Sequence, residues 1–80
     1  MQRLPVYEAF VRAAELGTFS AAASELRVQQ STISKWIAAL EAELGVTLFD
    51  RTTRSLRLTS DGERMLAGAR QMLAAYESAV

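Results

Sequence analysis

The sequence contains neither cysteine nor histidine among its 80 residues, and these absences exclude several classes of function. Without cysteine, the chain can form no disulfide, no thiolate metal site and no thiol nucleophile. Without histidine, it lacks the commonest acid–base catalyst and metal ligand. It also has no glycine-rich phosphate loop, and Asp61 and Glu63 would diverge on a helix. We therefore predict that the protein is not an enzyme and binds neither a metal nor a cofactor.

Long hydrophobic runs are also missing, although half of the residues are hydrophobic. No run approaches the length of a membrane-spanning helix, so no membrane association is expected. The first ten residues, MQRLPVYEAF, lack the apolar core of a signal peptide. A chain of this length forms one small domain. These features predict a cytoplasmic protein.

The single proline and two of the four glycines lie where helices are expected to begin and end. Pro5 suits the start of a helix over residues 5–16, and Gly17 suits its left-handed end. The buried stripe of this helix is predicted to contain Tyr7, Phe10, Val11 and Ala14. A second, short helix is expected over residues 19–26, with Thr18 or Ser20 as its cap.

A third helix is expected over residues 30–44, after a turn of three residues and before Gly45. Its apolar face is predicted to contain Ile33, Ile37, Leu40 and Leu44, with Trp36 at the edge. Its first residues are polar. Two helices joined by a short turn, the second with a polar start, indicate a helix-turn-helix, in which the second helix can enter the DNA major groove.

The hydrophobic period changes after Gly45. Leu56, Arg57 and Leu58 alternate with period two behind the polar residues 52–55, which predicts a β-hairpin, or wing, over residues 49–58. The last helix is expected to start at Thr59 or Ser60, since Ser60 and Glu63 form a capping-box pattern. The predicted fold is thus mostly α: a winged helix-turn-helix over residues 1–58, with three helices and the wing, followed by a long C-terminal linker helix over residues 59–80.

That final helix carries a broad apolar face at a spacing close to a heptad. A small winged domain would cover little of it, so we expect a second copy to bury it in a homodimer. The predicted interface residues are Met65, Leu66, Ala69, Met72, Leu73, Tyr76 and Val80.

Taken together, these features resemble the N-terminal DNA-binding domain of LysR-type transcriptional regulators across essentially the whole chain. The residues that carry the resemblance are Phe10; Gly17, Phe19, Ser20, Ala22, Ala23 and Leu26; Val28, Gln30, Ser31, Ile33, Ser34, Ile37, Leu40 and Glu41; Leu44, Gly45, Leu48, Phe49 and Arg51; Arg54; and Leu58, Thr59 and Gly62. The resemblance implies sequence-specific binding of double-stranded DNA and dimerisation through the linker helix. It also implies that a small-molecule effector acts only through a C-terminal domain absent from this chain, which thus looks like one part of a longer regulator.

Candidate DNA contacts lie first on the third helix. The Gln30 amide can bond adenine bidentately. Ser31 and Thr32 either contact DNA or cap the helix. We interpret Ser34 as a phosphate contact and Lys35 as a phosphate or guanine contact.

Three further candidates lie outside that helix. Ser20, at the start of the second helix, is placed to touch a phosphate, because helix N-termini attract anions. Arg54, at the wing tip, is predicted to reach backbone phosphate or the minor groove. Arg51 has two alternatives: it binds phosphate, or it pairs with Glu41 and holds the wing on the third helix.

Several alternatives stay open at this stage. The nine basic residues are balanced by nine acidic ones, whereas DNA-binding domains are usually basic. This neutrality favours a winged-helix protein–protein interaction module as the alternative function. Another winged-helix regulator family is a closer alternative. Gln29 stands where Ser or Thr commonly caps in the family, so Ser31 is an alternative cap that would start the helix later. Trp36 packs at the core edge, packs against the wing, or faces DNA.

Overall fold

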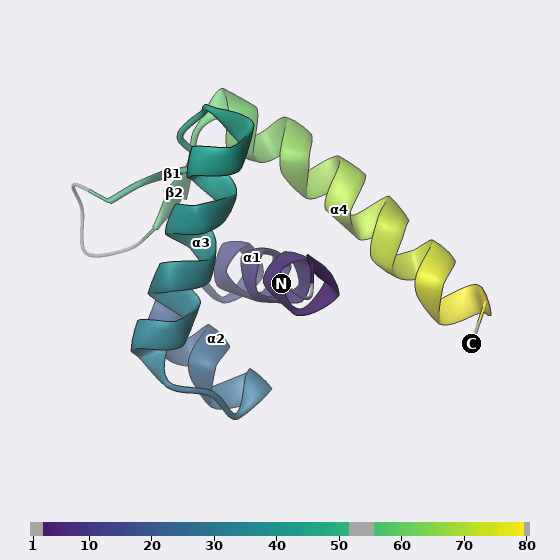
Figure 1. Cartoon of the computed structure of the whole chain (residues 1–80), viewed down its shortest axis with the longest axis horizontal. Coiled ribbons are helices and arrows are strands. Elements are labelled where there is room, and N and C mark those ends of the chain that lie inside the picture. The colour runs from purple at the N-terminus through teal and green to yellow at the C-terminus, as the bar shows by residue number, and fades with distance from the viewer. Residues whose placement is uncertain (1–2, 52–55, 80) are drawn as a thin grey trace.

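The computed structural model describes residues 3–51 and 56–79. Six elements follow in order: α1 (Arg3–Leu16), α2 (Phe19–Leu26), α3 (Gln30–Leu44), β1 (Phe49–Asp50), β2 (Arg57–Leu58) and α4 (Ser60–Ala79). Figure 1 shows α1, α2 and α3 gathered into one body, with the hairpin on one side of α3 and α4 extending away from the body. The predicted mostly α fold, a helix-turn-helix with a small hairpin and a long last helix, is confirmed.

Helix α1 lies at the centre of this body and contacts α2, α3 and α4. Its buried face is therefore wider than the predicted stripe: Val6, Ala9 and Ala13 are buried together with Phe10 and Val11, whereas Tyr7 and Ala14 are only half-buried. The helix begins at Arg3, two residues before Pro5. Proline is tolerated there because N–H groups in the first turn have no partner within the helix.

Helices α2 and α3 form the helix-turn-helix with the predicted bounds. The Thr18 hydroxyl accepts a hydrogen bond from the Ala21 N–H at 3.0 Å, so Thr18 is the cap of α2 and Ser20 is not. Gln29 stands at the N-cap of α3 and makes no side-chain cap bond, as its residue type predicts. The alternative with Ser31 as the cap is wrong, because the helix already includes Gln30; the Ser31 hydroxyl instead points back to the Gln29 Oε1 at 3.5 Å.

The last turn of α3 departs from one prediction. Leu44 is 37% exposed rather than buried, whereas Ile33, Ile37 and Leu40 are in the core. Leu44 is the final residue of the helix, and the chain turns directly after it at Gly45, which has the left-handed φ of 71° that glycine accommodates. The helical period was correct, but the core ends before the helix does.

The hairpin is short and is held mainly by its surroundings. Its register pairs Phe49 with Leu58 and Asp50 with Arg57. The Leu56 N–H donates to the Gly17 carbonyl at 3.0 Å, which attaches the returning strand to the turn after α1. The predicted tip, including Arg54, lies outside the described residues.

Helix α4 begins at Ser60, one of the two predicted starts, but its cap is the residue before the predicted capping box. The Thr59 hydroxyl accepts from the Gly62 N–H at 3.0 Å and donates to the Thr47 carbonyl at 2.5 Å, so Thr59 is the cap. The predicted Ser60–Glu63 box is therefore wrong. The Thr59 hydroxyl is also bonded to the Thr47 carbonyl. Thr47 lies far from Thr59 in the sequence, so a local capping pattern does not include this contact.

The part of α4 up to Leu73 packs on the rest of the chain. Ala69 is 2% exposed, and Met65, Leu66 and Leu73 pack against the same core. On the surface, Arg70 pairs with Glu15 of α1 at 3.0 Å. Exposed ion pairs of this kind contribute little stability each, so the apolar contacts hold α4 in place.

Candidate nucleic-acid interface

The outward face of α3 is the surface opposite its buried residues. Ile33, Ile37 and Leu40 point into the core. At 3.6 residues per turn, the opposite side contains Ser31, Lys35, Ala38 and Ala42, and all four are exposed. We call these four residues the outer face of α3. The side chains of this face are polar at the start of the helix and small after Lys35, and none of them is acidic.

The predicted DNA contacts on α3 share one end of the helix. Gln30 and Ser31 are exposed in its first turn, and Lys35 is exposed one turn further along. Thr32 and Ser34 flank the outer face and are half-buried. Ser20 is exposed in the first turn of α2. Arg54 lies outside the described residues, so the structure does not place it beside them.

Sequence reasoning missed Ala38 and Ala42 as parts of this surface. Their small side chains carry no chemistry that a motif search would detect. The spacing from Ser31 and Lys35 on the side opposite the core would have located them. A surface with short side chains lets the helix backbone approach another molecule closely.

Arg51 lies in an ion pair with Glu41, the second of its two predicted alternatives. The Arg51 Nη2 lies 2.9 Å from the Glu41 Oε1. The guanidinium also lies over the Phe19 ring, 5.2 Å from its centroid, a cation–π contact. Arg51 thus joins β1's end to α3 and to the start of α2.

Trp36 packs at the edge of the core. It is half-buried, packs against the buried cluster and lies beside Pro5, Glu8, Leu26 and Val28, which belong to α1, α2 and the turn. This confirms the packing alternative.

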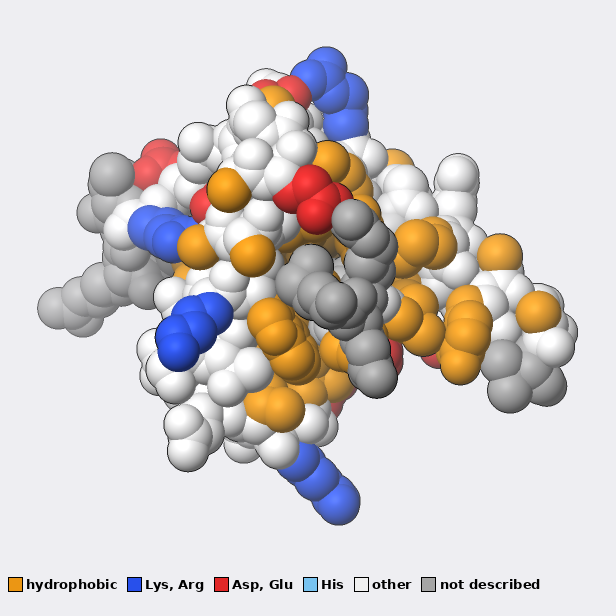
Figure 2. Space-filling model, viewed as in Figure 1, with side chains coloured by type: hydrophobic (Ala, Val, Ile, Leu, Met, Phe, Trp, Pro, Cys, Tyr) orange, Lys and Arg blue, Asp and Glu red, His pale blue; other side chains and the backbone are white. Residues whose placement is uncertain are grey.

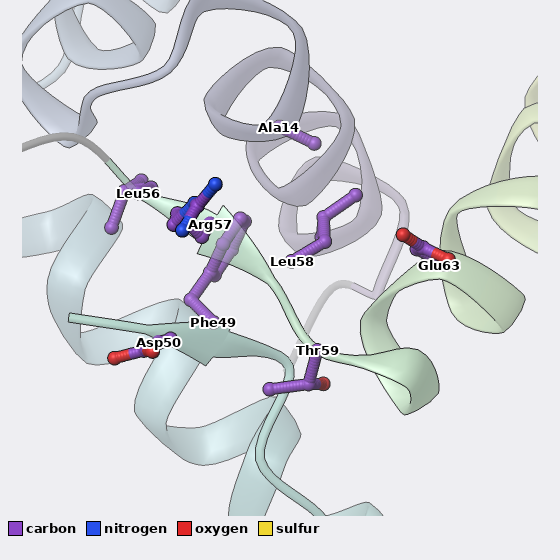
Figure 3. Close-up of a pocket in the computed structure, with 8 residues that line it drawn as sticks. All are labelled: Ala14, Phe49, Asp50, Leu56, Arg57, Leu58, Thr59 and Glu63. Carbon is purple, nitrogen blue, oxygen red and sulfur yellow. The ribbon is translucent and has the colours of Figure 1, made fainter.

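A cavity of about 580 Å³ lies under the hairpin, between α1, the two strands and the start of α4 (Figure 3). Asp50 and Arg57 border it from the paired strands, and Glu63 borders it from α4. Its rim therefore carries both signs of charge and has no clear preference for an anion. Within the described residues, no group of three or more acidic side chains could hold a metal ion.

The basic side chains that Figure 2 shows are scattered over that face of the molecule. Figure 2 shows them lying singly rather than as one patch, with acidic groups among them, whereas hydrophobic side chains run along α4. Among the residues of α3, Lys35 is the one basic side chain.

The apolar face of α4 divides into a covered part and an exposed part. Ala69 is nearly inaccessible against its own protomer, and Leu66 and Leu73 are partly covered. Met72 is 38% exposed and Tyr76 is 52% exposed, because this end of the helix extends beyond the body (Figure 1). Val80 lies outside the described residues. No helix in the described part of the chain is long and apolar enough to cross a membrane.

Comparison with known proteins places this geometry in a family. Residues 5–63 match the family described as bacterial regulatory helix-turn-helix proteins of the lysR family. A probable hydrogen peroxide-inducible genes activator of Mycobacterium leprae is 47% identical over 70 residues, which cover 88% of this chain and 22% of that protein.

Two solved structures share the fold over almost the whole chain. The crystal structure of a CbnR DBD–DNA complex is 37% identical with a TM-score of 0.91, covering 99% of this chain and 90% of that one. The BenM DBD/catB site 1 DNA complex is 31% identical with a TM-score of 0.92, covering 98% of this chain and 86% of that one.

The chain therefore belongs to the LysR family of bacterial regulatory helix-turn-helix proteins. It is a winged-helix domain for sequence-specific DNA binding in transcription regulation, and not an enzyme. The chain spans 22% to 48% of the length of the first curated relatives that it matches.

Proposed function

We propose that α3 is the recognition helix and enters the major groove of double-stranded DNA with its outer face. The observation that carries this proposal is the exposed, acid-free surface of Ser31, Lys35, Ala38 and Ala42 beside Gln30. A helix fits the major groove, and the N-terminal residues of a recognition helix contact base edges. The two similar solved structures are DNA complexes, which supports the same partner for this chain.

Within that arrangement, each predicted residue has a separate role. The Gln30 amide reads a base, and adenine offers it a bidentate partner. Ser31 and Thr32 contact a phosphate or a thymine methyl group, and Ser34 and Lys35 contact phosphate. Ser20 adds a phosphate contact at the start of α2, where helix N–H groups attract anions. Arg54 remains a predicted backbone or minor-groove contact of the wing.

We further propose that two copies pair through the end of α4. Met72 and Tyr76 supply its exposed part, Leu73 and Leu66 border it, and Val80 continues the same stripe in the sequence. Ala69 has almost no surface to offer, so the interface lies further toward the C-terminus than the sequence alone indicated. A dimer would hold two α3 helices at a fixed spacing, as two half-sites about 34 Å apart require. A small-molecule effector would act through the remainder of a longer cytoplasmic regulator.

Replacing Gln30 by alanine is expected to relax base preference at one or two positions of the bound sequence. Discrimination at those positions should fall by about 1–3 kcal/mol, the usual contribution of a bidentate base contact. Nonspecific binding should change little, because the amide carries no charge. Selection from a pool of random duplexes, performed with the unaltered chain and with Gln30→Ala, measures both quantities.

The matched control is Gln71→Ala, which removes the same amide from an exposed position on α4. It should select the same sequences as the unaltered chain. An equal loss of affinity for all sequences in Gln30→Ala would remove Gln30 from the base-reading set. Failure of the unaltered chain to bind any duplex at low salt would instead favour the protein–protein interaction module.

Replacing Tyr76 by aspartate is expected to shift the chain toward monomer. The change places a charge in the exposed apolar part of α4, and burial of an unpaired charge is costly. The dimer dissociation constant should rise by roughly 100-fold if Tyr76 is central to the interface. Sedimentation velocity over a concentration series measures the change.

Ala74→Asp is the control for this substitution, because Ala74 is exposed on the opposite side of the same helix. It should leave the association unchanged. If Tyr76→Asp associates as strongly as the Ala74→Asp chain, the interface does not lie on this part of α4.

A further inference from the structure

Glu41 connects α3 to the start of the hairpin through three hydrogen bonds. Its Oε2 accepts from the N–H of Leu48 at 2.8 Å and from the N–H of Phe49 at 3.3 Å. Its Oε1 accepts from Arg51 at 2.9 Å. The Glu41 side chain is only 17% exposed. Hydrogen bonds to a carboxylate are stronger than neutral ones, and partial burial protects them from water.

Aromatic contacts also attach the start of the wing to α2. The Phe49 ring meets the Phe19 ring edge-on, with centroids 5.9 Å apart. The Arg51 guanidinium lies over the same Phe19 ring, 5.2 Å from the ring centroid. The start of the wing is thereby held to α3 through Glu41 and to α2 through Phe19.

The hairpin needs such an external connection. Each strand has two residues, and isolated two-stranded hairpins are marginal in water even when longer. Its position relative to α3 is therefore determined by the contacts that attach it. DNA presents its grooves and phosphates at fixed distances, so a wing and a recognition helix can contact one duplex together only if their spacing is fixed.

We propose that Glu41 is a positioning residue for DNA recognition. This inference rests on the proposed placement of α3 and the wing on DNA. Glu41 sets the distance between α3 and the wing. Arg51 acts through its ion pair with Glu41 rather than as a phosphate ligand. The base pairs beside the α3 half-site then depend on Glu41, although Glu41 itself touches no DNA.

Electrostatics alone predicts the opposite effect of removing this carboxylate. DNA is a polyanion, so replacing Glu41 by neutral glutamine should tighten binding if charge were the only contribution. Release of Arg51 from its partner would strengthen it further. A positioning role predicts weaker binding. The glutamine amide has one acceptor oxygen in place of two, so its NH₂ group would face either the Arg51 guanidinium or the backbone N–H groups of Leu48 and Phe49, and could accept from neither. The sign of the change therefore separates the two roles.

The test compares Glu41→Gln with Glu8→Gln in the 80-residue chain, on duplexes selected with the unaltered chain. Glu8→Gln removes the same charge at an exposed position of α1. Glu41→Gln is expected to weaken binding about tenfold, on the order of losing one or two phosphate contacts. It should also lose discrimination among flanking base pairs while keeping preference within the half-site. Glu8→Gln should bind as tightly as the unaltered chain or more tightly.

A double variant, Glu41→Gln with Arg51→Gln, tests whether the connection itself matters. Two glutamine amides can form a neutral hydrogen bond in place of the ion pair. The double variant is expected to recover flanking discrimination relative to Glu41→Gln alone. Circular dichroism melting establishes that each variant is folded at the assay temperature.

Three outcomes would overturn the proposal: unchanged or tighter binding by Glu41→Gln, an equal loss of preference at half-site and flanking positions, or a double variant that does not recover flanking discrimination. Absence of DNA binding by the unaltered chain would overturn the proposed function itself, and is recognised before any variant is compared.

Discussion

Replacing Gly62 by alanine is expected to lower the free energy of unfolding by about 2 kcal/mol or more. A Cβ atom at this position would lie 2.1 Å from the Leu48 carbonyl oxygen and 2.9 Å from the Leu58 Cδ2. The leucine side chain can rotate away, but the carbonyl belongs to the backbone. Its oxygen also accepts the Thr59 N–H at 3.0 Å, so the backbone cannot move without losing that bond. Overpacking of this kind typically costs about 1–3 kcal/mol and occasionally more.

The intrinsic helix preference acts against this cost. Alanine is better than glycine inside a helix by about 1 kcal/mol, so a destabilised Gly62→Ala chain means that the clash outweighs the preference. For a domain of this size, a loss of 2 kcal/mol corresponds to a midpoint lower by roughly 10 °C. Urea and thermal unfolding, followed by circular dichroism at one fixed protein concentration, measure the change because association also affects apparent stability.

Gly68→Ala supplies the matched control on the same helix. No atom lies within 4 Å of a Cβ built at Gly68, so only the helix preference applies there. This variant is expected to be more stable by about 0.5–1 kcal/mol. If both variants are stabilised, the close approach of α4 to Leu48 does not require glycine, and the packing at the start of α4 must differ from the one described.

Features determined by neighbouring residues could be predicted from the sequence. Gly17 and Gly45 have φ angles of 86° and 71°, and both end helices as their residue type predicts. The bounds of α2 and α3 followed from such signals together with the helical period. Because capping and periodicity act within a turn or two of the chain, a single sequence is sufficient to locate them.

Features determined by distant parts of the chain could not be predicted in the same way. The sequence left Thr59 and Ser60 as alternative starts of the last helix, and its Ser60–Glu63 capping box is wrong. Thr59 is the cap, and its hydroxyl also donates to the Thr47 carbonyl, a contact that local patterns do not show. Ala69 is covered because α4 turns back onto α1, and the apolar stripe alone could not say whether its own protomer or a partner covers it. For Arg51, the sequence left two partners of equal chemical merit. The structure shows the Glu41 contact because β1 brings the guanidinium to α3.

Replacing Lys35 by glutamate is expected to weaken DNA binding by roughly 100-fold at moderate salt, the largest effect on DNA binding that we predict for a single substitution. Lys35 is the one cation on the outer face of α3 and is exposed there. The substitution removes one phosphate contact and places a like charge against the polyanion. Fluorescence anisotropy of a labelled duplex, titrated at several salt concentrations, gives both the affinity and its salt slope. The slope should become shallower by about 0.9 for the lost contact.

The neutral composition of the chain makes a charge-matched control necessary. Lys35→Glu changes the formal net charge from +0 to −2, because one positive charge is lost and one negative charge is gained. Arg64→Glu makes the same change at a side chain that is 77% exposed, on α4 beside Leu44 at the far end of α3. Nine residues separate Lys35 from Leu44, or roughly 14 Å along the helix, which exceeds the Debye length of about 10 Å at 0.1 M salt.

Arg64→Glu is therefore expected to weaken binding only a few-fold and to leave the salt slope unchanged. Equal losses of DNA affinity in the two variants would mean that the affinity depends on the total charge of the domain rather than on the outer face of α3. In that case α3 would not be the element in the groove. A large loss confined to Lys35→Glu would explain how a domain with no net charge binds a polyanion: through the position of one cation on an acid-free helix face rather than through the sum of its charges.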